Sequence, residues 1–256
     1  MAVNVLLLTG FGINAEKELG WAFEIAGGKV DIIHIEDVIE DKSMLDSYQI
    51  IGFPGGFSFG DHMGSGRVFA NLVKSNFIDE IKRFIEKDKL IIGICNGFQI
   101  ITKLGLVPDL DENFEQSVAL VENDSAKYED RWVWLKKDND KSPWLHGINR
   151  IYLPVRHGEG KLVTADQKVL ERIKSSGSVA LRYCAPDGAE PVYPYNPNGA
   201  VDNIAGLINK KGNVFGLMPH PEAYISRQNH PRWTEHIDNN EPMGLEIFKN
   251  GIKYFK

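Results

Sequence analysis

The segment Leu90-Ile-Ile-Gly93-Ile94-Cys95-Asn96-Gly97-Phe98-Gln99-Ile-Ile-Thr-Lys-Leu104 carries the strongest structural signal in the chain. An apolar run of strand length leads into Cys95 and a helical pattern follows it, with glycines two residues before and two residues after. This is the G-x-nucleophile-x-G arrangement of a strand-to-helix turn, with Cys as the nucleophile. Such a turn crowds the backbone on both sides, so residues without a Cβ are needed there. The alternative is a buried cysteine that only packs, and the two glycines argue against it.

The start of a helix directly after Cys95 gives the sulfur a second benefit. The positive end of the helix dipole and the free backbone N–H groups favour thiolate over thiol. The thiolate is the reactive form. We therefore predict that Cys95 is a catalytic nucleophile.

Short β-branched runs alternate with helical patterns on both sides of this segment. The expected buried strands are rich in Val and Ile and bounded by Gly or Pro: Val3–Thr9, Val30–Ile35, Gln49–Phe53 and Lys89–Ile94. Apolar residues at helical spacing predict helices over Asn14–Ala26 and Asn76–Lys87. This alternation predicts βαβ units and a parallel sheet with helices on both faces.

The second half of the sequence has a different pattern. Three strands joined without long helices indicate an antiparallel or mixed extension: Ser117–Glu122, Arg131–Lys136 and Ile151–Val155. Ser178–Tyr183 and Asn213–Met218 are two further expected strands. Cys184–Ala200 is rich in proline and turn formers and should be an irregular loop, and Met243–Tyr254 a terminal helix. With no linker, repeat or low-complexity segment, we expect one domain over residues 1–256.

Composition excludes several classes of function. With 43% hydrophobic and 25% charged residues the chain resembles an ordinary soluble protein. Its net charge of −6 argues against nucleic acid or an anionic membrane as the main partner. No apolar run reaches the roughly 20 residues of a membrane span, and the N-terminus lacks the features of a signal peptide. We expect a cytoplasmic protein whose two cysteines are reduced.

A cysteine nucleophile needs a base, and His220-Pro221-Glu222 supplies one. This triplet follows the expected strand Asn213–Met218, so it leaves the sheet at the carboxyl edge, as Cys95 does. His220 is the predicted general base, and Glu222 orients its ring and stabilises the imidazolium. The alternative is a structural histidine.

A second pair, His157-Gly158-Glu159, has the same spacing. Gly158 and Gly160 indicate a turn there. We assign His157 a structural or interface role.

The residues around Cys95 and His220 resemble the class I (triad) glutamine amidotransferases. More narrowly, the chain resembles the glutaminase subunits of phosphoribosylformylglycinamidine synthase, which act in purine biosynthesis. The resemblance spans residues 1 to about 225 and rests on motifs in this order: Gly10-Phe-Gly-Ile-Asn14 with Glu18, Pro54-Gly-Gly-Phe-Ser-Phe-Gly-Asp61, Gly93-Ile-Cys95-Asn-Gly97-Phe-Gln99, His157-Gly-Glu-Gly160, Asn196-Pro-Asn-Gly199, Ile204-Ala-Gly206 and Gly216-Leu-Met-Pro-His220-Pro-Glu222.

The resemblance implies a flavodoxin-like α/β fold with a mixed, mostly parallel sheet flanked by helices. It implies that Cys95 attacks the side-chain amide of L-glutamine, that ammonia leaves a thioester, and that water releases glutamate. By analogy the oxyanion hole is formed by the backbone N–H groups of Gly56 and Asn96. Gly55, Phe57 and Gln99 are then expected to line the glutamine pocket. Without the resemblance, Pro54–Phe57 reads equally well as an ordinary tight turn.

The chain departs from the family pattern in three places. Arg156 stands where a small residue commonly precedes His-Gly-Glu-Gly, which puts the local role of that segment in doubt. Cys184–Tyr195 looks like an insertion, and Cys184 itself is expected to be structural. Residues 223–256 extend beyond the family core, as a partner contact, which we favour, or as a surface cap; they include Arg227, His230, Arg232 and Trp233.

The sequence also lacks motifs that the complete reaction would need. It has no G-x-x-x-x-G-K-[ST] phosphate loop, no dinucleotide fingerprint and no clustered metal-ligand spacing. We expect no metal and no cofactor in this chain. Amination of formylglycinamide ribonucleotide consumes ATP, so the resemblance implies a large ATP-dependent synthase subunit that carries ATP and Mg, often with a small accessory subunit. We expect the isolated chain to be a poor glutaminase until it docks.

Three other functions remain open from the sequence. The chain could serve a different synthase, such as one for guanylate, carbamoyl phosphate or anthranilate; the segments Pro54–Asp61 and Asn196–Gly199 argue against this. It could be a Cys peptidase or hydrolase of the same fold, which would turn over peptides or esters. It could be a non-catalytic binding subunit, which the complete set of Cys95, His220 and Glu222 argues against.

Overall fold

A nine-stranded sheet runs through the molecule, in the order β2-β1-β3-β4-β11-β10-β9-β6-β7. The computed structural model describes residues 2–61, 63–235 and 242–256. The strands of this sheet are β1 (Val3–Thr9), β2 (Gly28–His34), β3 (Ile50–Phe53), β4 (Leu90–Ile94), β6 (Glu129–Lys137), β7 (Arg150–His157), β9 (Val179–Cys184), β10 (Ile204–Ile208) and β11 (Val214–Leu217). A separate antiparallel pair joins β5 (Val118–Val121) to β8 (Lys161–Thr164).

Strand direction divides the sheet into two parts. From β2 to β11 every neighbouring pair is parallel, and from β11 to β7 every pair is antiparallel. Two antiparallel steps restore the original direction, so β10 and β6 alone run against the rest of this sheet. The expected α/β fold with a mixed, mostly parallel sheet is confirmed.

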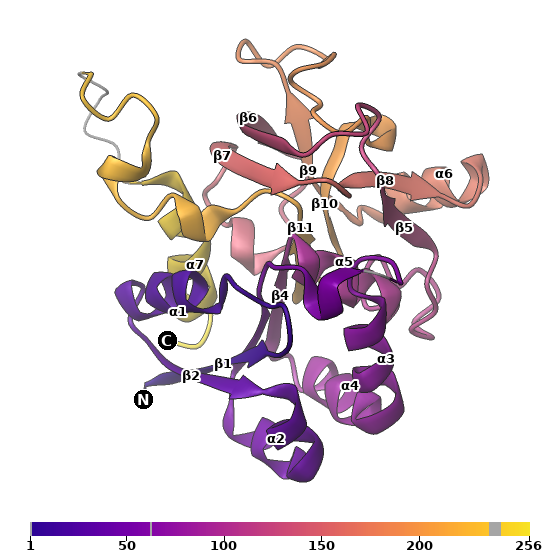
Figure 1. Ribbon diagram of the computed structural model, residues 1–256, viewed down its shortest axis with the longest axis vertical. Coiled ribbons are helices and arrows are strands. Elements are labelled where there is room, and N and C mark those ends of the chain that lie inside the picture. The colour runs from indigo at the N-terminus through magenta and orange to yellow at the C-terminus, as the bar shows by residue number, and fades with distance from the viewer. Residues whose placement is uncertain (1, 62, 236–241) are drawn as a thin grey trace.

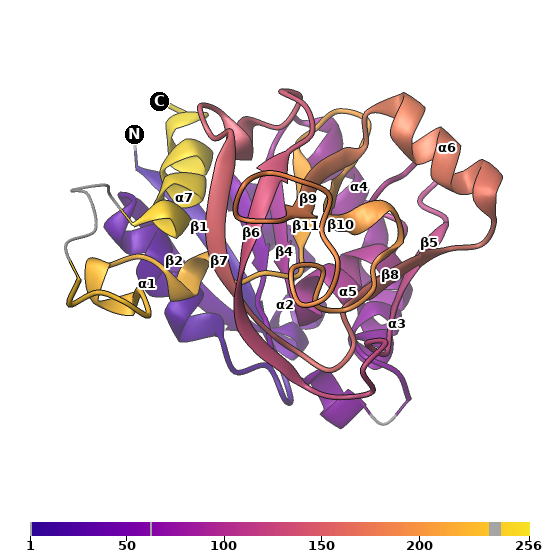
Figure 2. The ribbon, with the colours of Figure 1, turned by 90° about the horizontal axis from the view of Figure 1, so that it is seen from above.

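Helices cover both faces of the parallel strands. In both views α1 and α7 lie on one side of these strands, and α3, α4 and α5 on the other (Figures 1 and 2). The helices are α1 (Glu16–Ile25), α2 (Ile35–Glu40), α3 (Arg67–Asn76), α4 (Ile78–Glu86), α5 (Asn96–Lys103), α6 (Gln167–Ser176) and α7 (Met243–Lys253), with short 3-10 turns between several elements. Parallel strands need crossovers of this kind, because their ends lie at opposite edges of the sheet.

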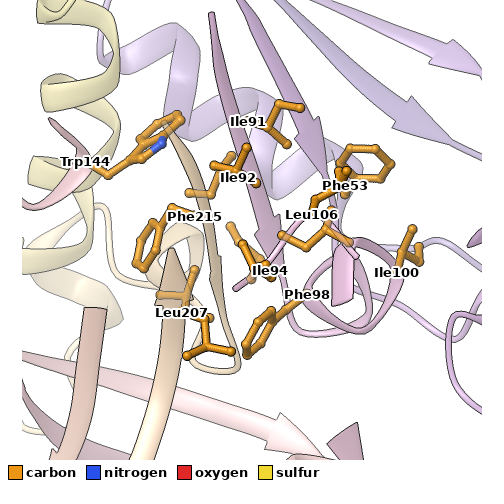
Figure 3. Close-up of a cluster of buried hydrophobic side chains, with 14 of the residues drawn as sticks. Phe53, Ile91, Ile92, Ile94, Phe98, Ile100, Leu106, Trp144, Leu207 and Phe215 are labelled. Atoms are coloured by element: carbon orange, nitrogen blue, oxygen red, sulfur yellow. The ribbon is translucent and has the colours of Figure 1, made fainter. Parts of the chain in front are cut away.

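Buried apolar side chains pack together where β4, β11 and α5 meet. Figure 3 shows Phe98 of α5 beside Ile94 of β4, with Phe215 and Leu207 of the next two strands close by. All four side chains are completely buried. This packing fixes the start of α5 against the ends of β4 and β11.

Several elements of the structure differ from the sequence prediction, among them α2 and β8, which were not predicted. The helix expected over Asn76–Lys87 is α4, and a further helix, α3, precedes it. No α-helix separates β5, β6 and β7, as expected, but α6, which spans ten residues after β8, was not predicted. α6 is mostly polar and buries only Leu170 and Ile173, so it offers few apolar residues as a signal. The completely buried strand β10 was also not predicted.

The C-terminal helix belongs to the core of the molecule. In α7, Phe248 is completely buried and its ring centroid lies 5.0 Å from that of Phe23 in α1. Asn250 donates hydrogen bonds to the carbonyl oxygens of Trp144 and His146. Residues 236–241 of the predicted extension lie outside the described residues. A partner contact within residues 223–256 stays a prediction.

Candidate functional site

The turn at Cys95 has the strained backbone that the sequence predicts for a nucleophile. Cys95 connects β4 to α5 with φ 51° and ψ −107°, in a region that residues with a Cβ rarely occupy. Its N–H donates to the carbonyl of Leu217 at 2.9 Å, which ties the turn to β11. The side chain is 6% exposed, and its sulfur lies 3.7 Å from the carbonyl oxygen of Arg156.

The two glycines that flank Cys95 are needed because the turn leaves no room for a Cβ on either side. A Cβ on Gly93 would lie 2.7 Å from the carbonyl oxygen of Gly97. A Cβ on Gly97 would lie 1.8 Å from the carbonyl oxygen of Phe53. Both distances are far shorter than contacts that a real Cβ tolerates, so the turn depends on glycine at both positions.

His220 and Glu222 form a buried pair at the same edge of the sheet. β11 and β4 are parallel neighbours, with Leu217 opposite Ile94, so the residues that follow both strands come together. The Nδ1 of His220 lies 2.5 Å from the Oε1 of Glu222, and both side chains are almost completely buried. The backbone N–H of His220 donates to Pro154. The predicted orientation of the base by its carboxylate thus has the geometry it needs.

Electrostatics favour a protonated imidazole at His220. Burial alone lowers its pKa, but the nearby charges of Glu222 and Cys95 more than compensate and raise the pKa to about 10. Since Nδ1 faces Glu222, Nε2 remains for other partners, and among the described residues it has no hydrogen-bond partner. A histidine with this pKa is suited to stabilise a neighbouring thiolate.

The Pro54–Asp61 loop is clamped against the first loop of the chain. The carbonyl of Gly55 accepts hydrogen bonds from the N–H groups of Asn14 and Ala15, and Phe57 donates to Gly12. Gly56 has φ 151°, and its N–H donates to no backbone acceptor among the described residues. The same is true of the N–H of Asn96, the first residue of α5. These two N–H groups are therefore free for a ligand.

Gly55 lies beside Cys95 and His220. A Cβ at this position would stand 2.9 Å from Cε1 of His220 and 3.6 Å from Cβ of Cys95. Gly55 does not line the cavity described below, contrary to expectation. Its contribution is space for the imidazole ring.

Gln99 connects two loops instead of facing the cavity. Its Oε1 accepts from Nδ2 of Asn96 at 2.8 Å, and its Nε2 donates to the carbonyl of Glu159 at 2.6 Å. The Oδ1 of Asn96 in turn accepts from the N–H of Ser58. The expected pocket role of Gln99 is therefore corrected to a structural link. The sequence did not predict this link, because Glu159 is 60 residues away from Gln99.

His157 lies buried at the end of β7, and its contacts suit the structural or interface role that we expect for it. It is buried, its Nδ1 lies 3.2 Å from Oδ1 of Asn123, and that oxygen also accepts from the N–H of Gly160. Burial and then the charge of His220 lower the pKa of His157 to about 3. A Cβ on Gly160 would lie 2.4 Å from the His157 ring. His157 therefore stays neutral and holds the turn after β7.

A cavity of about 300 Å³ opens over Cys95. It is lined by Asn14, Ala15, Glu18, Gly56, Phe57, Cys95, Tyr128, Arg156 and His220. The volume suits a small metabolite. Phe57, which was expected in the pocket, lines this cavity, and so does Gly56, which was expected in the oxyanion hole. Nothing in the sequence pointed to Tyr128. Glu18 was noted there only because it fits the family's first loop, and Arg156 only because it departs from the family pattern.

Arg156 is a charged residue beside His220 and Glu222, a position that the sequence did not predict for it. Its Nη2 donates to Oε2 of Glu18 at 3.0 Å and lies 3.3 Å from Nδ1 of His220 and 3.9 Å from Oε1 of Glu222. Burial lowers the pKa of Arg156, but the contact with Glu18 and the charge of Glu222 raise it overall. The guanidinium therefore remains charged at the cavity.

Among residues 2–61, 63–235 and 242–256 no group of three or more His, Cys, Asp or Glu side chains could hold a metal ion. No helix in the described part of the chain is both long and apolar enough to span a membrane. Cys184, the second cysteine, is completely buried and unpaired.

Comparison with known proteins gives matches over the whole chain. Residues 2–255 match the family described as the CobB/CobQ-like glutamine amidotransferase domain. A protein of Methanococcus maripaludis named phosphoribosylformylglycinamidine synthase subunit PurQ is 42% identical, covering 98% of this chain and 97% of its own length. A protein of the same name from Dehalococcoides mccartyi is 40% identical, covering 98% and 97%.

Solved structures show the same likeness. A chain from the structure of PurLQS of Thermotoga maritima superposes with a TM-score of 0.76 and 31% identity, covering all of both chains. A putative GMP synthase subunit from Thermoplasma acidophilum superposes with a TM-score of 0.55, covering 99% of this chain and 94% of its own. At 13% identity that second likeness shows the shared fold alone.

Proposed function

This chain belongs to the CobB/CobQ-like glutamine amidotransferase family, as a PurQ-type glutaminase subunit of phosphoribosylformylglycinamidine synthase, and on that premise we propose that Cys95, His220 and Glu222 perform the hydrolysis of L-glutamine. The observation that carries the assignment is their convergence. A strained cysteine at the end of β4 and a buried His–Glu pair after β11 meet at one cavity.

The reaction follows from the chemistry of these groups. The Cys95 thiolate attacks the side-chain amide carbon of glutamine, and the C–N bond breaks as the His220 imidazolium gives its proton to the leaving ammonia. A γ-glutamyl thioester remains. His220 then takes a proton from water, which attacks the thioester and releases glutamate and the Cys95 thiolate. Glu222 holds the imidazole in one orientation through both steps.

The backbone N–H groups of Gly56 and Asn96 form the oxyanion hole in this proposal. Both are free of backbone acceptors, Gly56 lines the cavity, and Asn96 follows the nucleophile at the start of α5. A pair of such donors stabilises the negative oxygen of each tetrahedral intermediate. Removal of one donor typically reduces the rate by about 10²–10³-fold.

The ammonia is used by partner subunits. We assign the ATP and Mg of the amination step to a large synthase subunit, and we include a small accessory subunit in the complex, since the similar Thermotoga maritima chain comes from a structure of PurLQS. The substrate of that step is formylglycinamide ribonucleotide, and the product is formylglycinamidine ribonucleotide. We place the complex in the cytoplasm.

The test is glutamate release from glutamine by the wild-type and Cys95→Ala chains, each alone and with the cognate synthase subunits, ATP and formylglycinamide ribonucleotide. We expect wild-type turnover to rise in the complex and to vanish in the Cys95→Ala chain. Cys184→Ala is the matched control, because it removes a buried cysteine that does not line the cavity. Turnover that survives in Cys95→Ala would overturn the assignment of the nucleophile.

A further inference from the structure

Two opposite charges lie at the mouth of the cavity above the nucleophile. The side chains of Glu18 and Arg156 are 50% and 34% exposed, whereas Cys95 is 6% exposed. Glu18 comes from α1 and Arg156 from β7, and Oε2 of the first lies 3.0 Å from Nη2 of the second. The cavity therefore leads from a charged outer end to a buried inner end at Cys95.

The rest of the cavity wall carries no fixed charge of this kind. Apart from Cys95 and His220, the other described lining residues are Asn14, Ala15, Gly56, Phe57 and Tyr128. Glutamine has a neutral amide at one end and an α-ammonium with an α-carboxylate at the other. With the amide at Cys95, the zwitterionic end lies toward the mouth of the cavity.

We infer that Glu18 binds the α-ammonium group and Arg156 the α-carboxylate of glutamine. This inference rests on the proposed glutaminase function and adds the recognition of the amino-acid end. The two side chains pair with each other, and the substrate supplies a partner of opposite charge to each. Arg forms strong charge-assisted hydrogen bonds with carboxylates.

The guanidinium of Arg156 has unused N–H donors for this role. All its described contacts with Glu18, His220 and Glu222 involve Nη2, so Nε and Nη1 have no partner among the described residues. The 3.3 Å contact with His220 does not occupy the guanidinium, because the Nδ1 proton of His220 points to the Glu222 carboxylate 2.5 Å away and leaves no lone pair.

A different role would be to position the His220–Glu222 pair. In that case Arg156 would affect the chemical step for every amide substrate to the same extent. Recognition of the α-carboxylate would instead affect only substrates that have one. Two truncated amides separate these roles: 4-carbamoylbutanoate lacks the α-ammonium of glutamine, and 4-aminobutanamide lacks its α-carboxylate.

The experiment measures kcat/KM for ammonia release from glutamine and from both truncated amides. In Glu18→Gln we expect a loss of about ten- to hundredfold for glutamine and 4-aminobutanamide, with little change for 4-carbamoylbutanoate. In Arg156→Gln we expect a loss of kcat/KM of the same size for glutamine and 4-carbamoylbutanoate. The loss for 4-aminobutanamide should be small in comparison. Ratios between substrates cancel any effect on the chemical step.

A second readout does not depend on turnover. Iodoacetamide alkylates a reactive cysteine without using an amino-acid end, and glutamine bound in the cavity should protect Cys95 from it. We expect tenfold or higher glutamine concentrations for half-protection in Glu18→Gln and Arg156→Gln. Glu24→Gln is the matched control, because Glu24 is an exposed carboxylate on the same helix that does not line the cavity.

The outcomes are distinct. Unchanged substrate ratios and unchanged protection in both variants would overturn the inference and leave the glutaminase function intact. An equal loss for all three amides in Arg156→Gln would assign it to positioning of His220 and Glu222, and would also overturn the inference. A wild-type chain that neither hydrolyses glutamine nor is protected by it, even in the complex, would overturn both the function and the inference.

Discussion

The carbonyl oxygen of Phe53 lies 1.8 Å from the position that a Cβ atom on Gly97 would occupy. β3 ends at Phe53 and α5 begins next to Cys95, so this close approach brings the end of one strand against the helix that follows the nucleophile. Any side chain at residue 97 must push the two apart. The position of Cys95 therefore depends on a contact between segments that are 44 residues apart in the sequence.

Gly97→Ala should damage the site through this contact. We expect a destabilisation of about 1–3 kcal/mol or more from overpacking, together with a large loss of kcat because the turn at Cys95 moves. Urea unfolding and glutamate release measure the two effects. Gly158→Ala is the control, since a Cβ there meets nothing within 4 Å. Equal behaviour of the two variants would contradict the role of the Phe53 contact.

Glu222→Gln should lower kcat while it preserves the shape of the site. The amide cannot stabilise the imidazolium of His220, with which Oε1 of Glu222 now makes a 2.5 Å contact. We expect kcat for glutamine to fall by about a hundredfold or more, by analogy with loss of the carboxylate in other nucleophile triads. Glu246→Gln, an exposed position on α7, should have no effect. A fall of less than threefold in Glu222→Gln would argue against the proposed role.

The raised pKa of His220 predicts a dependence of stability on pH. Burial lowers this pKa, but Glu222 and Cys95 raise it overall from 6.5 to about 10. The folded state therefore holds the proton more tightly than the unfolded state. The resulting stabilisation is complete below about pH 6.5 and is lost as the pH rises through about 10. The free energy of unfolding of the wild type should fall across this window more steeply than that of Glu222→Gln. Parallel pH profiles for the two chains would refute the prediction.

His157 should show the opposite behaviour at lower pH. Its pKa is lowered to about 3, first by burial and then by the charge of His220, so the folded chain stays unprotonated where the unfolded chain binds a proton. Stability should therefore fall as the pH drops from about 6.5 toward 3, and less so in His157→Gln. Glutaminase kcat should stay within about tenfold of the wild type, in contrast to His220→Gln. The exposed His146→Gln serves as the control. A kcat loss in His157→Gln as large as that in His220→Gln would give His157 a chemical role.

Gln99→Leu tests whether Gln99 links Asn96 to Glu159 or instead contacts the substrate in the pocket. The change removes the contacts with Asn96 and the Glu159 carbonyl and leaves buried polar groups unpaired, which should cost about 1–3 kcal/mol. We expect a lower Tm and a reduced kcat, with the KM for glutamine nearly unchanged. Gln167→Leu, an exposed position at the start of α6, is the matched control. A rise in KM without loss of stability would restore the pocket role.

The fold and the edge of the sheet that holds the site could be predicted from local patterns. Buried parallel strands read as continuous apolar runs, so β1, β3 and β4 were located within one residue of their observed bounds. The helices α2, α3 and α6 and the strands β8 and β10 were not predicted. α6 is mostly polar and buries only Leu170 and Ile173, so its place depends on tertiary packing.

The sequence by itself determined the nucleophile, the base and its carboxylate as candidates, because each follows a recognisable strand within a few residues and glycines mark the sharp turn at Cys95. Only the tertiary structure decided the cavity wall. Glu18, Tyr128 and Arg156 reach the cavity from distant segments, and Gln99 turns away from it to join two loops. The physical reason is range: strand and turn signals depend on neighbouring residues, whereas the pairing of Arg156 with Glu18 spans 138 residues and exists only after the sheet has brought α1 and β7 together.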